Sequence, residues 1–178
     1  FPSFTPASDV LDPIIRGVKS AKIRCFLGQE VRAIAPDGVT LRSEERINAD
    51  AVVVATGFTL FDAHRKQEYG YGLYDNVITS VDLERMMNSG KVLLTDGTEP
   101  RRIAILHCVG SRDEKVCQKH CSKVCCITGV KQAIELKEMF PTADVFNFYM
   151  DIRMFGPGYE ELYREAQQRY NVHFVRGR

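Results

Sequence analysis

Five of the six cysteines in this chain lie within nineteen residues, between Cys108 and Cys126. The segment reads CVGSRDEKVCQKHCSKVCC. Cysteine is normally sparse and scattered in an intracellular domain, so this density indicates a chemical use. Four kinds of site collect cysteines in this way: a disulfide framework, a zinc site, a redox dithiol and an iron–sulfur cluster. The segment is therefore predicted to carry metal or redox chemistry.

Four of these cysteines are expected to face one point. Cys121 and Cys125 are four residues apart and would share one face near the start of a predicted helix. Cys126 is adjacent, and Cys108 lies where a predicted strand ends. A strand end and the following helix N-terminus converge in a βαβ unit, and that terminus offers free N–H groups and a positive dipole end. Both stabilise thiolates, which suits a negatively charged iron–sulfur cluster.

Zinc is the closest metal alternative, because His107 and His120 are available beside the cysteines. Structural zinc sites usually draw their ligands from pairs of cysteines that are separated by a few residues. The adjacent residues Cys125 and Cys126 argue against zinc, since two neighbours rarely reach one tetrahedral ion without strain. A cubane cluster has four separate irons, each of which needs one thiolate, so it tolerates adjacent ligands better.

Interpretations without a metal explain fewer of the cysteines. A redox disulfide between Cys121 and Cys125, or between Cys117 and Cys121, leaves the other thiols unexplained. A single free cysteine is often a small buried hydrophobic residue, but five in one short segment are hard to explain in that way. We expect the ordinary buried role for Cys25, which lies in a β-rich segment far away in the sequence. Cys117 is left open as a spare thiol, a substitute ligand or an exposed bystander.

The last third of the chain alternates strands and helices. Its apolar and amphipathic stretches predict a strand over 102–107, a helix over 122–140, a strand over 144–150, a helix after Pro157-Gly158 and a strand over 172–175. Short connections between such elements predict a parallel sheet with right-handed crossovers. The sequence therefore predicts an α/β fold with a partial Rossmann-type, doubly wound sheet over 101–178. We expect the chain to stop inside this fold, because nothing completes the other half.

A β-rich region is predicted before the cysteine segment. Residues 22–27 and 30–34 favour strands, and Pro36-Asp37-Gly38 supplies turn chemistry. The run 47–58 has a continuous β-branched centre that is stopped by Thr-Gly. Such a run is typical of a strand buried on both faces, as in a parallel sheet.

Between these regions, residues 59–100 have a mixed pattern. Thr79 or Ser80 is predicted to cap a short helix that extends through Met87, because a hydroxyl side chain there can accept from the free N–H groups of the first turn. The turn-forming residues 97–100 mark a boundary before the first strand of the last third.

The composition excludes several classes of protein. The chain has 178 residues, a formal net charge of +1 and 44% hydrophobic residues, which is ordinary for a soluble globular protein. This charge gives no electrostatic reason to expect nucleic acid or an anionic membrane as a partner. The longest apolar run, 51–55, is too short to span a bilayer, and no signal peptide is visible. We expect a cytoplasmic protein whose chain, lacking a first methionine, is processed or cut from a longer one.

The cysteine segment resembles a known family. The resemblance is carried by CVGSRD at 108–113, HCS at 120–122, VCC at 124–126 and KQA at 131–133, with further matches on both sides. These residues resemble the A subunit of heterodisulfide reductase and the related flavoprotein subunits of the quinone-interacting membrane-bound oxidoreductase. The resemblance covers roughly 49–178 and is weak or absent in the first forty residues.

The resemblance implies a thioredoxin-reductase-like protein related to the FAD-dependent pyridine nucleotide-disulfide oxidoreductases. Its members combine an FAD domain with a second dinucleotide-type domain that carries a [4Fe–4S] cluster. Carried over by residue, the ligands of that cluster would be Cys108, Cys121, Cys125 and Cys126, and Cys117 would lie outside the pattern. Such proteins relay electrons within multi-subunit complexes, so the expected partners are other redox subunits, and a homodimer is a further expectation.

The FAD domain is implied only in part. By resemblance, the segment 1–58 would be a β-rich fragment of that domain, 59–100 a connecting segment and 101–178 the domain with the cysteines. Thr56, Gly57 and Phe58 would lie beside the flavin nucleotide, where glycine permits close backbone approach. The chain contains no G-x-G-x-x-G fingerprint for FAD or NAD. We therefore expect FAD in the complete protein rather than on this chain alone.

The second domain departs from the dinucleotide-binding pattern at the position of that fingerprint. His107 and Cys108 stand there, and a thiolate would crowd and repel a pyrophosphate. We interpret the site as converted from dinucleotide binding to cluster binding. The predicted function is an electron-transfer module of a flavo-iron–sulfur oxidoreductase, with no catalytic side chain of its own. The alternatives are a zinc-stabilised structural or interaction domain and a fragment of a pyridine nucleotide-disulfide oxidoreductase that uses a cysteine pair.

One charged pair outside the cysteine segment is expected to be structural. Asp151 and Arg153 flank Ile152 near a predicted strand end, and we expect them to form an ion pair. Arg112, four residues after Cys108, is expected to cap the loop or to place positive charge near the cluster. The sequence shows no Ser/His/Asp constellation and no paired carboxylates, so hydrolytic catalysis is not predicted.

Overall fold

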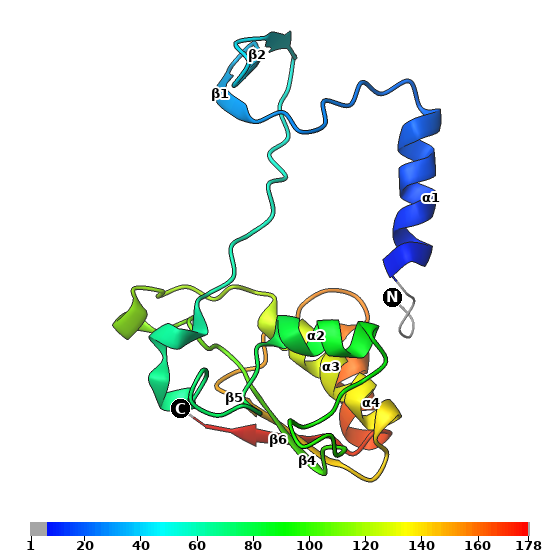
Figure 1. The fold of residues 1–178 in the computed structure, drawn as a ribbon, viewed down its shortest axis with the longest axis vertical. Helices are drawn as coiled ribbons and strands as arrows, with labels where there is room; N and C mark the ends of the chain where they lie inside the picture. The colour runs from blue at the N-terminus through cyan, green and yellow to red at the C-terminus, as the bar shows by residue number, and fades with distance from the viewer. Residues whose placement is uncertain (1–6, 178) are drawn as a thin grey trace. The chain divides into compact units, whose positions relative to one another are not determined.

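The computed structural model describes residues 7–177, and the chain divides into two compact units, Phe1–Thr59 and Leu60–Arg178. Figure 1 shows the chain as a ribbon with its helices and strands labelled. The division falls one residue after the segment 1–58, which the resemblance assigned to an FAD domain. Residues 60–100 are part of the second unit, where they help to hold the cysteine segment.

The first unit contains one helix and a small antiparallel sheet. The helix is α1 (Ala7–Ser20), and the strands are β1 (Val31–Ala35), β2 (Gly38–Leu41) and β3 (Arg46–Asn48), paired in the order β1-β2-β3. The predicted turn connects β1 to β2, as the Pro-Asp-Gly sequence indicated. Residues 22–27 were predicted as a strand but form none.

The run 47–58 is not the doubly buried strand that its sequence predicted. Only its first two residues belong to β3, and residues 51–58 have no regular secondary structure and are exposed. Val53 is 89% exposed. A strand buried on both faces needs neighbouring strands for its backbone and covering elements for its side chains. The described part of the first unit supplies neither to residues 51–58.

The second unit is built on a three-stranded parallel sheet, as predicted. Its strands are β4 (Arg102–Leu106), β5 (Asp144–Tyr149) and β6 (His173–Arg176), in that spatial order. The connecting helices are α3 (Cys125–Met139) and α4 (Tyr159–Gln168), and α2 (Ser80–Asn88) precedes the sheet. Three short 3₁₀ turns complete the elements: η1 (Ala63–Arg65), η2 (Gln67–Tyr69) and η3 (Glu114–Val116).

The core of the second unit lies between one face of the sheet and its helices. The largest fully buried residues of α3 are Val130, Gln132 and Leu136, and Val145 and Asn147 of the central strand β5 are also fully buried. Figure 1 shows α2, α3 and α4 gathered together, and α3 contacts both α4 and β5. In the described residues the sheet is thus covered by helices on one face, rather than on both faces as in a complete doubly wound fold.

The opposite face of the sheet leaves apolar side chains exposed. Leu106, Phe148 and Val175 come from the three strands and are 48%, 39% and 39% exposed. Side chains alternate along a strand, so these residues point away from the core that Val145 and Asn147 enter. This alternation explains why the same strands carry both the most buried and the most exposed apolar residues of the sheet.

The helix predicted near Thr79 is present as α2. The Thr79 hydroxyl accepts from the backbone N–H of Asp82, and the Asp82 carboxylate accepts from the N–H of Thr79, which is a capping box. Gln132 of α3 donates to the carbonyl oxygen of Ser80 at 3.0 Å and to a carboxylate oxygen of Glu84 at 2.9 Å. These bonds attach α2 to α3. No helix in residues 7–177 is long and apolar enough to cross a membrane.

Candidate metal centre

The cysteine segment connects the end of β4 to the start of α3. Cys108 follows β4 by two residues, and Cys125 and Cys126 are the first two residues of α3. The backbone N–H of His107 donates to the carbonyl oxygen of Phe148 at 3.0 Å, which continues the pairing of β4 with β5 up to the site. The parallel sheet therefore brings a strand end and a helix N-terminus together, as the sequence predicted.

The backbone of this segment is unusual. Six non-glycine residues in the described part of the chain have positive φ angles, and four of them lie here: Cys108 (60°), Arg112 (58°), Cys117 (60°) and Lys123 (62°). Each such residue costs about 1–2 kcal/mol relative to ordinary backbone, so the surrounding structure must hold it in place. Backbone strain of this kind concentrates at functional sites.

A buried lysine holds the middle of the segment. Lys66 is 5% exposed, and its Nζ lies 2.6 Å from a carboxylate oxygen of Asp113 and 2.5 Å from one of Glu68. The hydrogen bond from Lys66 holds the pKa of the Asp113 carboxyl below its usual range. Arg65 donates from Nη2 to the carbonyl oxygen of Val116 at 3.1 Å. The segment 60–70 thus anchors the loop that carries the cysteines.

A second anchor lies at Gly110. Its φ is 72°, and a Cβ placed on it would come within 2.1 Å of the Phe61 ring. Only glycine satisfies both the backbone angle and the close approach of the ring. The Phe61 ring therefore fixes the backbone two residues after Cys108.

Three of the four predicted ligands converge. Cys108 and Cys126 both lie beside Cys125, close enough to affect its ionisation, and the Cys126 thiol donates to the carbonyl oxygen of Asp151 at 3.7 Å. The ligand atoms of His107, Cys125 and Cys126 all lie within 4.8 Å of one another. The hydrogen bond from Cys108, followed by those from Cys126 and His107, strongly lowers the pKa of Cys125. Three sulfurs and an imidazole therefore share one small volume.

The pKa values of the other two thiols are raised. For both Cys108 and Cys126, the largest cause is the hydrogen bond to Cys125, followed by burial. A thiolate at Cys125 makes further ionisation beside it unfavourable, because like charges at short distance repel. A bound cationic centre would offset this repulsion and favour the thiolate form of all three.

Backbone N–H groups point at the sulfurs. The N–H of Arg153 donates to Cys126 Sγ at 3.4 Å, the N–H of Lys123 donates to Cys121 Sγ at 3.3 Å, and the N–H of Cys108 is hydrogen-bonded to Cys125. Such bonds stabilise thiolate charge, and hydrogen bonds to ligand sulfurs are one of the levers that set the potential of iron–sulfur clusters. Together with the cysteine thiols, they make the donor set suitable for a thiolate-bound metal centre.

Cys121 is placed differently from its prediction. It lies before α3, not on a helical face shared with Cys125, because Lys123 has a left-handed φ of 62° and the helix starts only at Cys125. Cys121 is half-buried, and its sulfur is not among the ligand atoms of His107, Cys125 and Cys126 that lie within 4.8 Å of one another. Cys117 is exposed, and Cys25, which was expected to be buried, is exposed in the first unit.

Asp151 forms ion pairs with three arginines near the cysteines. Its carboxylate lies 2.8 Å from Arg112, 3.3 Å from Arg176 and 3.9 Å from Arg153. The predicted ion pair with Arg153 is present, but the contact with Arg112 is shorter. For Arg112 the sequence predicted a role in the loop or near the cluster and no contact with Asp151. Arg112 also lowers the pKa of Cys108 through its charge. This network ties the loop after β4 to the loop after β5.

The proposed flavin contacts lie in the first unit. Thr56, Gly57 and Phe58 belong to the exposed segment that has no regular secondary structure, and Phe58 is 76% exposed. Gly57 has a φ of 72°, and a Cβ on it would meet no atom within 4 Å. The described residues therefore give this tripeptide a turn-like backbone without an enclosed surface.

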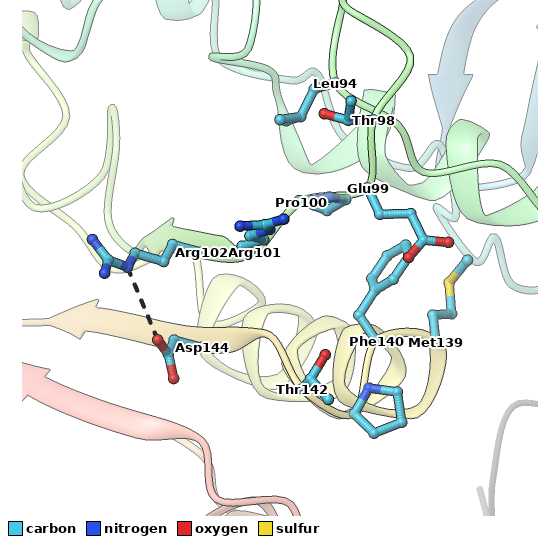
Figure 2. Close-up of a pocket in the computed structure, with 11 residues that line it drawn as sticks. Leu94, Thr98, Glu99, Pro100, Arg101, Arg102, Met139, Phe140, Thr142 and Asp144 are labelled. Atoms are coloured by element: carbon cyan, nitrogen blue, oxygen red, sulfur yellow. Dashed lines mark ion pairs between the residues drawn. The ribbon is translucent and has the colours of Figure 1, made fainter.

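A hollow of the second unit lies at the other end of the sheet. The hollow has a volume of about 1090 Å³. Figure 2 shows the residues that line it, which include the weak ion pair of Arg102 with Asp144 at 4.0 Å. Those residues begin β4 and β5, whereas the cysteines follow the strand ends. Ligands of parallel α/β sheets bind at the carboxyl ends of the strands, so the cysteine end is the better candidate site.

Comparison with known proteins finds relatives along the whole chain. The chain is 41% identical over 188 aligned positions to the A subunit of the H(2):CoB-CoM heterodisulfide,ferredoxin reductase of Methanothermobacter marburgensis, covering 100% of this chain and 27% of that protein. It is 43% identical over 165 positions to the iron-sulfur A subunit of the CoB–CoM heterodisulfide reductase of Methanocaldococcus jannaschii, covering 88% of this chain and 25% of that protein.

A third relative matches a shorter part of the chain more closely. The A subunit of the H(2)/formate:CoB-CoM heterodisulfide,ferredoxin reductase of Methanococcus maripaludis is 48% identical over 141 positions, which cover 76% of this chain and 21% of that protein. The similarity extends further than the predicted 49–178, since the first of these relatives covers every residue. The chain spans about a quarter of the length of these relatives. No protein-family model matches the sequence.

Proposed function

Because this chain belongs by sequence to the family of heterodisulfide reductase A subunits, we propose that it is an electron-transfer module of a flavo-iron–sulfur oxidoreductase. Its cofactor would be a [4Fe–4S] cluster held by Cys108, Cys121, Cys125 and Cys126. The relatives are named as subunits, and from this we propose that the chain acts in a complex with other redox subunits. The module carries electrons and has no catalytic side chain.

One observation carries this proposal. Cys108 from the strand end and Cys125 and Cys126 from the helix start bring three thiols together at the carboxyl edge of a parallel sheet. A dinucleotide phosphate would need a glycine-rich turn at that edge, and thiols stand in its place. A cluster at this position would also draw on the backbone N–H groups of Arg153 and Lys123, which already donate to sulfur.

Each part of the chain has a distinct task in this proposal. The cluster, when bound, supplies a one-electron carrier. Cys121 would complete the donor set through a movement of the segment before α3 that brings its sulfur to the other three. Arg112 would place positive charge near Cys108, and the anchor at Lys66 would keep the loop in position. FAD would belong to the complete protein, with Thr56 to Phe58 as its contacts.

The test is the stoichiometry of iron and acid-labile sulfide, with zinc measured in parallel, after anaerobic reconstitution of the chain. We expect about four irons and four sulfides per chain. Cys125→Ser should lose most of the iron, whereas Cys117→Ser, at an exposed cysteine outside the donor set, should retain it. One tightly bound zinc without sulfide would contradict the electron-transfer function of this chain.

A zinc site is the second candidate function, and a specific observation favours it. His107, Cys125 and Cys126 can place one ligand atom each within 4.8 Å of one another, and Cys108 lies beside Cys125. Three cysteines and one histidine form a common structural zinc site. In that case the module would be a metal-stabilised structural domain, and Cys121→Ser would leave the metal content unchanged.

A further inference from the structure

The imidazole of His107 occupies a place that α3 leaves open for it. A Cβ on Gly129, in the interior of that helix, would come within 2.7 Å of His107 Nε2. Glycine in a helix interior costs roughly 0.5–1 kcal/mol relative to alanine, so the helix gives up stability at the position where the ring packs. The ring therefore lies between the sheet and α3, directly beside the thiols of Cys125 and Cys126.

Asn147 holds the far side of this ring. It lies in the central strand β5 and is 0% exposed, and its Oδ1 is 2.8 Å from His107 Nε2. Within the described residues, two buried polar atoms of this pair have no hydrogen-bond partner: Asn147 Nδ2 and His107 Nδ1. An unpaired buried N–H group, such as that of Asn147 Nδ2, is costly. A different placement of the protons in this pair would therefore be more stable.

A rotation of the Asn147 amide by 180° supplies that arrangement. The oxygen and nitrogen of an amide side chain are interchangeable in shape, so their positions follow from the hydrogen bonds around them. With Nδ2 toward the ring, Asn147 donates to His107 Nε2, and the neutral ring carries its proton on Nδ1. That proton then faces the sulfurs. The group left unpaired is the Asn147 oxygen, which costs less than an unpaired N–H.

We infer that His107 is a positioning residue that donates a hydrogen bond from Nδ1 to the sulfur of Cys125, in a tautomer fixed by Asn147. The buried, unpartnered Nδ1 of His107 supports this geometry, as do the ligand atoms of His107 and Cys125, which lie within 4.8 Å of each other. The inference rests on the proposed function, because it concerns Cys125 as a cluster ligand. It assigns His107 to the tuning of the cluster and leaves Cys121 as the fourth ligand.

The hydrogen bond has a measurable consequence. Reduction adds one negative charge to a cluster and its thiolates, and an N–H donor stabilises the more negative state more strongly. His107 therefore makes the midpoint potential less negative than it would be without the donor. The effect needs only the N–H group and not a charge on the ring.

The test compares two substitutions at His107 in the reconstituted 178-residue chain. His107→Leu removes both ring nitrogens, whereas His107→Asn keeps an N–H donor at the position of Nδ1, since both groups are attached to Cγ. We expect both variants to hold the same iron and sulfide as the unchanged chain. In a redox titration, the potential should shift to a more negative value in His107→Leu and return most of the way in His107→Asn.

A spectroscopic measurement on the unchanged chain makes the test independent of the folding of the variants. In a reduced sample labelled with ¹⁵N-histidine, we expect a weak nitrogen coupling and an exchangeable proton near the cluster. A strong coupling, typical of a nitrogen bound to iron, would overturn the inference and make His107 a ligand. Equal potentials in His107→Leu and the unchanged chain would also overturn it. A chain that binds no iron and sulfide at all would contradict the proposed function itself.

Discussion

Two runs of apolar, β-branched residues in this chain look alike in sequence and differ in structure. Residues 51–55 in the first unit read AVVVA, and residues 102–106 in the second unit read RIAIL. Both runs predict a strand of a parallel sheet. The second run forms β4, whereas the first has no regular secondary structure and leaves Val53 89% exposed.

The difference lies in what surrounds each run. β4 pairs with β5 over five residues, from Arg102 with Asp144 to Leu106 with Phe148, and helices cover one face of the sheet. Residues 51–55 have no strand partner in the described part of the first unit. Apolar sequence thus indicates a tendency to form a strand, and partners that satisfy the backbone and bury the side chains decide whether it does so.

The largest effect should come from placing a charge in each region. Val145→Asp puts a carboxylate at a fully buried position of β5, and we expect a loss of more than about 4 kcal/mol, enough to unfold the second unit. Val53→Asp, at an exposed position, should change the free energy of unfolding by less than about 0.5 kcal/mol. Hydrogen exchange followed by mass spectrometry measures the protection of each unit separately.

One result with these two variants would contradict the structural difference between residues 51–55 and β4. Strong loss of protection in the first unit on Val53→Asp would show that residues 51–55 are buried in solution. The predicted strand would then be correct, and the contrast with β4 would vanish.

The sequence predicted the second unit better than the first. Strands β4, β5 and β6 and helix α3 were predicted to within three residues, and α4 starts where it was predicted, because apolar periodicity and turn residues agree there. Helix α1 was missed, although Leu11, Ile14, Ile15 and Val18 follow the spacing of one helical face. Pro13 lies inside that helix, and a proline normally argues against a helix interior.

The sequence predicted which cysteines would lie near one another better than it predicted the residues that support them. Of the four cysteines expected to face one point, the structure brings Cys108, Cys125 and Cys126 together, and their role as ligands stays a prediction. Lys66 and Asn147 carried no visible signal, because a buried lysine and a buried asparagine are recognised by their partners, and those partners are distant in sequence. The position of Cys121 was wrong, since nothing in the sequence shows that Lys123 has a left-handed backbone.

A second contrast concerns two glycines with the same backbone angle. Gly110 and Gly57 both have a φ of 72°, but only Gly110 has a ring, Phe61, in the place of a Cβ. Gly110→Ala should therefore cost about 2–4 kcal/mol, from strain and overpacking, and should lower iron uptake. Gly57→Ala should cost about 1 kcal/mol or less, because its exposed segment can relax. Urea unfolding and iron content measure both effects, and equal losses in the two variants would remove the contrast.

A buried and an exposed ion pair should differ in how much they stabilise the protein, and we expect this difference to be of intermediate size. Lys66→Met removes a cation that is 5% exposed and bonded to Asp113 and Glu68, so it should loosen the cysteine loop. Arg42→Met removes an exposed partner of Glu30 in the first unit and should change little. Protection of residues 108–124 against hydrogen exchange reports the loosening. Equal protection in the unchanged chain and Lys66→Met would show that the anchor is dispensable.

The same anchor has a defined dependence on pH. The pKa values of Asp113 and Glu68 are lowered by Lys66, so their contribution to stability is present above the ordinary carboxyl pKa of about 4 and is lost as the pH falls through their lowered values. The pKa of Lys66 is raised, so its contribution is lost only above its ordinary value, at strongly alkaline pH. Between pH 7 and pH 3, the unchanged chain should lose its advantage over Lys66→Met, as measured by urea unfolding at each pH.

The smallest effect should come from the cap of α2, which the sequence alone predicted. Thr79→Ala removes the hydroxyl that accepts from the Asp82 N–H. It also weakens the reciprocal bond of the Asp82 carboxylate, so the free energy of unfolding of the second unit should fall by about 1 kcal/mol. Thr59→Ala, at an exposed threonine outside any helix or strand, should lose less than about 0.5 kcal/mol. Urea unfolding compares the two variants under one condition. If the loss in Thr79→Ala were as small as that in Thr59→Ala, the bonds from Gln132 to α2 would suffice to hold the helix, and tertiary contacts would outweigh local capping even where the sequence signal is strongest.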